Sequence, residues 1–219
     1  MSIFPEIKHI FVGKKQEQLY NNKPVLTAIF KDEVQEPIYA TKLGFQQDEQ
    51  ADTKHHGGED KAICVYLNES YTYWGKYNQH SINVGSFGEN LVFSFLKEDE
   101  VCIGDIYKIG SAVVQVSQPR QPCFKLGIRN NWPEMVVISR NSGYTGFYLR
   151  VLEEGEITPQ DKIELMSKEE KRYSIKYVNE LLYGQHVTST QIEEALQLTS
   201  LADSCKKDLT KKLNKLQTL

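Results

Sequence analysis

Cysteine is scarce in this chain, and its spacing suggests no pairing. The 219 residues include only four cysteines, Cys64, Cys102, Cys123 and Cys205, with no CxxC pair and no spacing typical of a zinc site. This distribution argues against a secreted domain held together by disulfides. We therefore expect a reducing, cytoplasmic setting, in which any special cysteine owes its chemistry to its own surroundings.

Long apolar runs and a strong charge of one sign are also missing. No segment approaches the roughly 18 apolar residues that span a bilayer, and no basic patch precedes an apolar run near the N-terminus. We therefore expect neither a membrane span nor a signal peptide. The formal net charge of -3 and the pI near 6.0 provide no overall field to attract nucleic acid. Glycine-rich phosphate loops of the GxGxxG and GxxxxGK[ST] kinds are absent as well.

Residues 1–166 have the pattern of a β-rich domain. Gly110 and Ser111 lie between apolar runs at residues 106–109 and 112–116, which predicts a tight hairpin. Helices are predicted at residues 68–77 and around residues 132–140. Further runs of strand length occupy residues 7–12, 24–30, 62–66, 147–152 and 162–166. Many short strands at irregular spacing predict a mainly β fold with some α structure, a closed β-barrel with helical insertions.

Residues 167–219 predict a small three-helix extension. Capping-box patterns begin at Ser167 and at Thr188, Gly184 is suited to end the first helix, and Asp203 is suited to cap the third. About fifty residues bury too little apolar surface to be very stable alone. We therefore expect this unit to pack on the barrel or on another subunit, the second arrangement giving a homodimer.

The most unusual segment is the loop that leads to Cys123. Pro119 and Pro122 restrict the backbone on either side of Arg120. Arg120 precedes Cys123 by three residues and Lys125 follows it by two, and a nearby cation favours the thiolate form of a cysteine. A thiolate binds metals or attacks electrophiles. The alternative is a buried cysteine at the base of a loop, with Arg120 paired to a surface carboxylate, and these residues alone leave both open.

A second candidate loop contains His56, Gly57, Gly58 and Lys61. Paired glycines let the backbone come close to a ligand, and the charged groups around them suit a polar or phosphorylated one. The alternative is an exposed polar turn.

Three further residues carry polar groups for which the sequence leaves alternative roles open. In the loop at residues 85–91, Glu89 and Asn90 either hydrogen-bond a heterocycle or cap the loop. Arg150 lies in an otherwise apolar strand, where its charge must pair with an acid, reach solvent or bind an anion.

Taken together, four segments resemble the MOSC family, named for the C-terminal domain of molybdenum cofactor sulfurase. In order, they are HHGGEDKAICVY at 55–66, GSFGENL at 85–91, IGDIYKIGSAVVQVSQPRQPC at 103–123 and GFYLRVLEEGEI at 146–157. The resemblance implies a β-barrel with helical decorations at residues 1–166. The tail at residues 167–219 resembles the three-helix extension of a bacterial subgroup.

The resemblance also implies a site. Cys123 is the expected molybdenum ligand, or the carrier of a sulfur atom in members that pass sulfur on, and His56 is a candidate proton donor. The molybdenum cofactor is anionic through its phosphate. The residues expected to bind it are Gly57, Gly58, Lys61, Glu89, Asn90, Ser117, Arg120 and Arg150.

The function implied by the resemblance is reduction of small N-hydroxylated compounds, including hydroxylamino-purines. Because the chain has no flavin or iron–sulfur motif of its own, a separate flavin or iron–sulfur reductase must supply electrons. Two other functions stay open. One is a sulfur carrier with a persulfide on Cys123, and the other is a non-catalytic carrier of the cofactor. Stable binding to nucleic acid or to a membrane is not expected.

Overall fold

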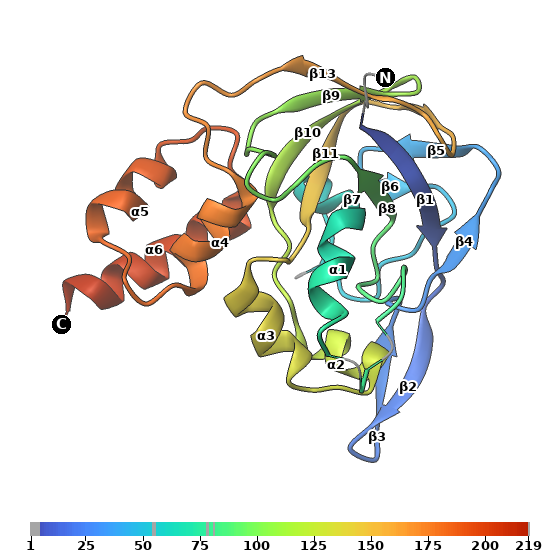
Figure 1. Ribbon diagram of the computed structural model, residues 1–219, viewed down its shortest axis with the longest axis horizontal. Coiled ribbons are helices and arrows are strands. Elements are labelled where there is room, and N and C mark those ends of the chain that lie inside the picture. The colour runs from blue at the N-terminus through green and yellow to red at the C-terminus, as the bar shows by residue number, and fades with distance from the viewer. Residues whose placement is uncertain (1–4, 54–55, 78, 81, 219) are drawn as a thin grey trace.

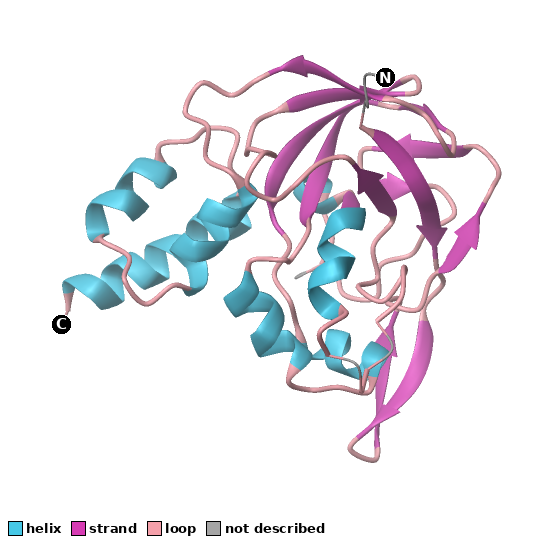
Figure 2. Cartoon of the chain, viewed as in Figure 1, coloured by secondary structure: helices cyan, strands magenta, loops and turns pink. Residues whose placement is uncertain are grey.

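The centre of the molecule is an eight-stranded sheet. The computed structural model describes residues 5–53, 56–77, 79–80 and 82–218 (Figures 1 and 2). The strand order is β13-β9-β10-β11-β7-β8-β1-β4, and β7 and β8 are parallel. The bounds of these strands are β1 (Glu6–Val12), β4 (Asp32–Val34), β7 (Ile63–Leu67), β8 (Leu91–Ser94), β9 (Ile106–Ile109), β10 (Ala112–Pro119), β11 (Phe147–Glu153) and β13 (Ile163–Ser167).

Two smaller sheets accompany the large one. A hairpin of β2 (Gln16–Tyr20) and β3 (Lys23–Thr27) projects from the body of the molecule in Figure 1. The other sheet has three strands, β5 (Ile38–Thr41), β6 (Gly44–Phe45) and β12 (Gly155–Ile157), in the order β12-β5-β6.

The predicted closed barrel is wrong for the described part of the chain. The sheet ends at β4 and β13, and these edge strands do not pair with each other. The sheet does curl, because the N–H of Ile7 donates to the Asp161 carbonyl at 3.1 Å and the N–H of Ile163 donates to the Pro5 carbonyl at 2.9 Å. A pattern of short strands predicts how many strands form. Whether the outermost two meet depends on sheet twist and on tertiary packing.

The predicted strands are present, with the run at residues 112–116 extended to Pro119 in β10 and the run at residues 24–30 shortened. β9 and β10 form the hairpin expected around Gly110, whose φ of 59° lies in the left-handed region that a turn of this kind requires. The run predicted at residues 24–30 ends early, at Thr27. The Thr27 hydroxyl accepts the N–H of Ile29 at 3.2 Å, and this local turn leads the chain out of the hairpin.

The helices in the first part of the chain differ more from the prediction. The segment predicted at residues 68–77 is divided into a 3-10 turn, η2 (Asn68–Ser70), and a short helix, α1 (Tyr71–Trp74). The prediction around residues 132–140 corresponds to α3 (Met135–Ser142). A helix that was not predicted, α2 (Phe124–Asn130), begins directly after Cys123.

The three predicted tail helices are present as α4 (Ile175–Tyr183), α5 (Ser189–Leu196) and α6 (Asp203–Gln217). The capping box at Thr188 is confirmed and Gly184 ends α4. The box predicted at Ser167 is wrong, because that residue pairs with Ile106 in the sheet and Ser174 caps α4 instead. Asp203 is the first residue of α6 and does not cap it.

The tail packs on the sheet. Ile175, Ile192 and Leu209 are buried in one hydrophobic core together with sheet residues such as Val116. Figure 1 shows α4, α5 and α6 grouped beside the end of β10. Of the two placements expected, packing on the sheet is therefore present. The homodimer and the domain boundary after residue 166 stay predictions.

None of the helices in the described part of the chain combines the length and the apolar character needed to cross a bilayer.

Candidate functional site

Several loops meet in a cleft beside β7 and β10. The cleft encloses about 630 Å³ of open space, a volume that includes solvent at its mouth. Segments from across the chain line it, from the end of β3 to the beginning of β11. Among the predicted site residues, those that line it are His56, Lys61, Asn90, Arg120 and Cys123.

The backbone of the Cys123 loop, defined as residues 119–123, is held at successive positions. The N–H of Arg120 donates to the Gly146 carbonyl at 3.0 Å, and the Pro122 carbonyl accepts Nη2 of Arg140 at 2.6 Å. The Cys123 carbonyl accepts the N–H of Leu126, in the first turn of α2, at 2.9 Å. The loop therefore presents the Cys123 side chain from a fixed backbone.

Cys123 differs from the other three cysteines in its exposure. Cys64, Cys102 and Cys205 are buried, and burial raises their thiol pKa to about 11, 11 and 12. They are therefore neutral thiols at neutral pH. Cys123 is partly exposed and lines the cleft, and all four cysteines are free of disulfides. Cys64 borders the same cleft but is only 7% exposed, so Cys123 is the more accessible of the two to a ligand or a reagent.

Arg120 places an unsatisfied cation at the cleft wall. Its residue exposure is only 6%. Nη2 donates to the Phe87 carbonyl at 2.7 Å, but Nη1 has no hydrogen-bond partner among the described residues. A buried donor without an acceptor is costly, and a charged one more so. An anionic ligand in the cleft would satisfy it.

Lys61 and His56 line the cleft beside Arg120, and they differ in charge. Burial lowers the pKa of the Lys61 ammonium below its usual value, while the carboxylate of Asp208 acts in the opposite direction. Burial, reinforced by the charges of Arg120 and Lys61, lowers the pKa of His56 from its usual 6.5 to about 4. His56 is therefore a neutral imidazole at neutral pH, able to form hydrogen bonds without adding charge.

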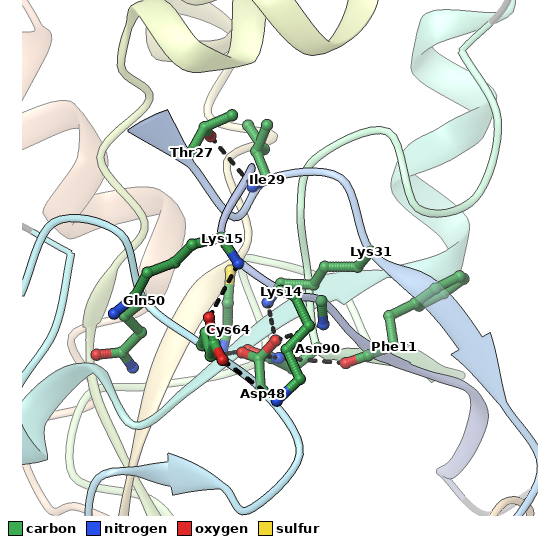
Figure 3. A network of polar contacts seen from close by, with 12 residues as sticks. Phe11, Lys14, Lys15, Thr27, Ile29, Lys31, Asp48, Gln50, Cys64 and Asn90 are labelled. Atoms are coloured by element: carbon green, nitrogen blue, oxygen red, sulfur yellow. Dashed lines mark hydrogen bonds and ion pairs between the residues drawn. The ribbon is translucent and has the colours of Figure 1, made fainter. Parts of the chain in front are cut away.

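A second wall of the cleft, formed by Lys31, Asp48 and Asn90, is a closed polar network (Figure 3). Lys31 and Asp48 form an ion pair in which the side chains are 6% and 7% exposed. Nδ2 of Asn90 donates to the second Asp48 oxygen at 2.8 Å, and the N–H of Gly13 donates to the first at 2.7 Å. Asn90 also accepts the N–H of Cys64 through Oδ1 at 3.1 Å. Asn90 therefore borders the cleft, and its side-chain amide is already used in hydrogen bonds to Asp48 and Cys64.

The remaining predicted residues lie outside the cleft lining, namely Gly57, Gly58, Glu89, Ser117 and Arg150. Of these, Glu89 is buried and caps its own loop. Its carboxylate accepts the N–H of Gly85 at 2.8 Å and of Phe87 at 3.0 Å, and also contacts the Tyr71 hydroxyl. His55, the other histidine of the resembling segment, lies outside the described residues.

Ser117 and Arg150 act on the cleft indirectly, through the short turn η1 (Glu59–Lys61). The Ser117 hydroxyl contacts the Asp60 carbonyl at 2.6 Å, and Nη2 of Arg150 pairs with the Asp60 carboxylate at 2.7 Å. Gly58, with a φ of 91°, leads into this turn. Both side chains therefore fix the residue that precedes Lys61. For Arg150, pairing with an acid is the alternative that the structure bears out.

The cleft also contains residues that the sequence pattern did not single out, including Lys31, Asp48, Phe87 and Tyr148. Lys31 and Asp48 are 17 positions apart and follow no local motif, so no sequence signal could have joined them. For Tyr148, alternation along the strand offered a signal, because it shares a face with Arg150 two residues later.

Comparison with known proteins identifies the family. A model of the MOSC domain matches residues 52–164, which include His56 and Cys123. The chain belongs to the MOSC domain family. The protein YflK of Bacillus subtilis (strain 168) is 41% identical over 205 residues, which cover 94% of this chain and 93% of YflK. The crystal structure of YiiM from Geobacillus stearothermophilus matches with a TM-score of 0.80 and 35% identity, covering 95% of this MOSC chain and 99% of that one.

A third relative is much longer. A protein named Reductase from Gibberella moniliformis (strain M3125 / FGSC 7600) is 34% identical over 178 residues. The match covers 80% of this MOSC chain but only 32% of that protein.

MOSC domains are generally associated with the molybdenum cofactor, and the chemistry of the cleft fits such a group. Cys123 offers a reachable sulfur, a suitable ligand for a soft metal. Nη1 of Arg120 offers an unused hydrogen-bond donor to an anion, beside the cationic side chain of Lys61. The residues present could therefore hold a metal-bearing, anionic cofactor.

Proposed function

We propose that this MOSC protein is a molybdenum-cofactor reductase of small N-hydroxylated compounds, with Cys123 as the protein ligand of the metal. The observation that carries the proposal is the meeting of two groups in one cleft. One is the reachable thiol of Cys123, and the other is the buried, unsatisfied Nη1 of Arg120. The first suits the metal and the second suits the anionic part of its cofactor.

The bound cofactor would supply two electrons, so that R–NHOH, two electrons and two protons give R–NH₂ and water. The chain would bind and orient the reactants. Arg120 and Lys61 hold the anion, and the Cys123 loop keeps the sulfur at a fixed position.

His56 is proposed to handle a proton in the loaded cleft. Its pKa of about 4 makes it a poor proton donor at neutral pH. Burial is the main cause of this low pKa, and an anion beside Arg120 and Lys61 would offset the positive charges that reinforce it. Binding would thereby raise the pKa of His56 and let it carry a proton.

The electron donor is proposed to be a separate flavin or iron–sulfur reductase in the cytoplasm. The match to about a third of a longer protein named Reductase supports a reductive activity, because the matching region belongs to a protein of that name. Four free cysteines agree with a reducing compartment.

The test is the molybdenum content per chain, measured by elemental mass spectrometry on protein from a host that makes the cofactor. We expect near-stoichiometric metal in the wild type and in the control Cys102→Ala, whose thiol is outside the cleft lining. Cys123→Ala should contain almost none. The loaded protein should then reduce a hydroxylamino-purine when a chemical electron donor is added.

Three other results would change the assignment. Undiminished molybdenum in Cys123→Ala would refute this residue as the ligand. A wild type without metal but with one extra sulfur atom on Cys123 would indicate a sulfur carrier. Metal bound without any reduction of N-hydroxylated substrates would indicate a carrier of the cofactor.

A further inference from the structure

The tail helices reach the two residues that precede Cys123. Nε2 of Gln121 donates to Oδ2 of Asp208 in α6 at 2.9 Å. The side chain next to Pro122 is therefore held by α6.

Pro122 is held by Arg140 of α3, which α4 holds in turn. Nη2 of Arg140 donates to the Pro122 carbonyl at 2.6 Å. The Arg140 carbonyl accepts Nδ2 of Asn179 at 2.8 Å, and its guanidinium lies 5.4 Å from the centre of the Tyr183 ring. Asn179 is 3% exposed, so this connection runs through the interior.

The beginning of α6 fastens the strand that leads into the loop. The Ser204 hydroxyl donates to Oε1 of Gln118 at 2.6 Å, and the N–H of Ala202 donates to the Ser117 carbonyl at 3.0 Å. Gln118 and Ser117 are completely buried. The tail thus contacts Ser117, Gln118 and Gln121 directly, and it reaches Pro122 only through Arg140 of α3.

The loop needs such external contacts because of its prolines. Pro119 and Pro122 have no N–H, so they cannot fasten this segment by donating backbone hydrogen bonds. The Arg120 N–H donates to the Gly146 carbonyl, and the contacts with the helices use a side chain and a carbonyl group, with partners in α6 and α3.

We infer that the three-helix tail forms part of the functional site, with Asp208 and Arg140 as positioning residues that hold the Cys123 loop. The inference deepens the proposed function, since Cys123 is the group that is positioned. Asp208 acts through Gln121, and Arg140 acts through the Pro122 carbonyl. Neither residue needs to touch the bound cofactor.

The test measures the rate at which iodoacetamide alkylates each cysteine in folded, cofactor-free protein, followed by peptide mass spectrometry. Asp208→Ala removes the acceptor of Gln121, and loss of one such hydrogen bond should free the loop enough to speed alkylation of Cys123 by about fivefold. Asp208→Asn keeps an acceptor oxygen and should react at nearly the wild-type rate. Asp203→Ala, an exposed carboxylate on the same helix, is the matched control and should change nothing.

Cys205 supplies an internal check, because it is buried on α6 itself. Its rate should stay unchanged in Asp208→Ala. In a Gln121→Ala background, Asp208→Ala should have no additional effect on Cys123, because its partner is already absent.

Three outcomes would overturn the inference. The first is an unchanged Cys123 rate in Asp208→Ala. The second is an equal rise for Cys205, which would mean that the helix has opened as a whole. The third is an Asp208→Asn protein in which Cys123 is alkylated as fast as in Asp208→Ala. That result would mean that the negative charge of Asp208, and not its hydrogen bond to Gln121, controls the rate. Because no metal is used, these results do not depend on whether the proposed reductase activity is found.

Discussion

The two walls of the cleft bury cations in opposite ways. On one wall Lys31 is paired with Asp48, and that carboxylate is further bonded to Asn90 and to the backbone (Figure 3). On the other wall Arg120 is just as deeply buried, yet its Nη1 has no partner among the described residues. The ammonium group of Lys31 therefore has a counter-ion within the protein, whereas Nη1 of Arg120 has no hydrogen-bond acceptor among the described residues.

This difference shows why burial alone does not identify a ligand-binding cation. Lys31 and Arg120 both line the cleft. A cation with an internal counter-ion stabilises the frame, while a cation with a spare donor gains from an external anion. We therefore expect substitution of Lys31 to lower mainly the free energy of unfolding. Substitution of Arg120 should weaken mainly the binding of an anionic cofactor.

The largest effect is expected at the neutral wall. Lys31→Met leaves the buried Asp48 carboxylate without its counter-ion, and breaking such a pair costs about 3–5 kcal/mol of the free energy of unfolding. Denaturant unfolding followed by circular dichroism measures this. Asp48→Asn added to Lys31→Met should recover much of the loss, and a fully additive double variant would contradict the pairing.

The next effect is expected at the cationic wall, in binding. Arg120→Met should reduce molybdenum retention about tenfold or more, because a hydrogen bond to a charged group is lost, while the free energy of unfolding changes by about 1 kcal/mol or less. Arg150→Met is the matched control, since that guanidinium pairs with Asp60 outside the cleft lining. Equal loss of metal in both variants would show that general positive charge is what matters.

The smallest effect concerns His56 and pH. Its pKa in the folded chain, about 4, lies below its usual 6.5, so the folded state binds fewer protons than the unfolded state between these values. The stability associated with the neutral ring is present above pH 6.5 and is lost as the pH falls towards 4. His56→Gln should flatten this part of the stability profile, whereas His186→Gln, on an exposed side chain, should leave it unaltered. Superimposable profiles for wild type and His56→Gln would contradict the assignment.

Local patterns predicted the elements whose signals lie within a few residues. The hairpin at Gly110 and the capping box at Thr188 follow from adjacent residues, and both are present. The box at Ser167 failed because pairing with Ile106, distant in the sequence, extends the strand through that residue. A backbone ladder supplied by a neighbouring strand outweighs a local capping preference.

The site divides in the same way. The pattern around Cys123 directed attention to that residue and to Arg120, and the structure places both in one cleft with His56 and Lys61. Glu89 and Arg150 carry the same kinds of polar group, but they cap a loop and pair with an acid. Residue type alone could not separate these roles, because each depends on which partner lies within hydrogen-bond distance.

The sequence by itself determined the β-rich character, the three tail helices, the family and the cysteine on which the proposed chemistry rests. Tertiary structure decided that the described sheet stays open at β4 and β13, that Lys31 pairs with Asp48 while Nη1 of Arg120 has no hydrogen-bond partner among the described residues, and that Asp208 accepts a hydrogen bond from Gln121. The physical reason is range. Strand alternation, caps and turns are set by neighbours in the chain, whereas the partner of a buried charge comes from wherever the fold brings one.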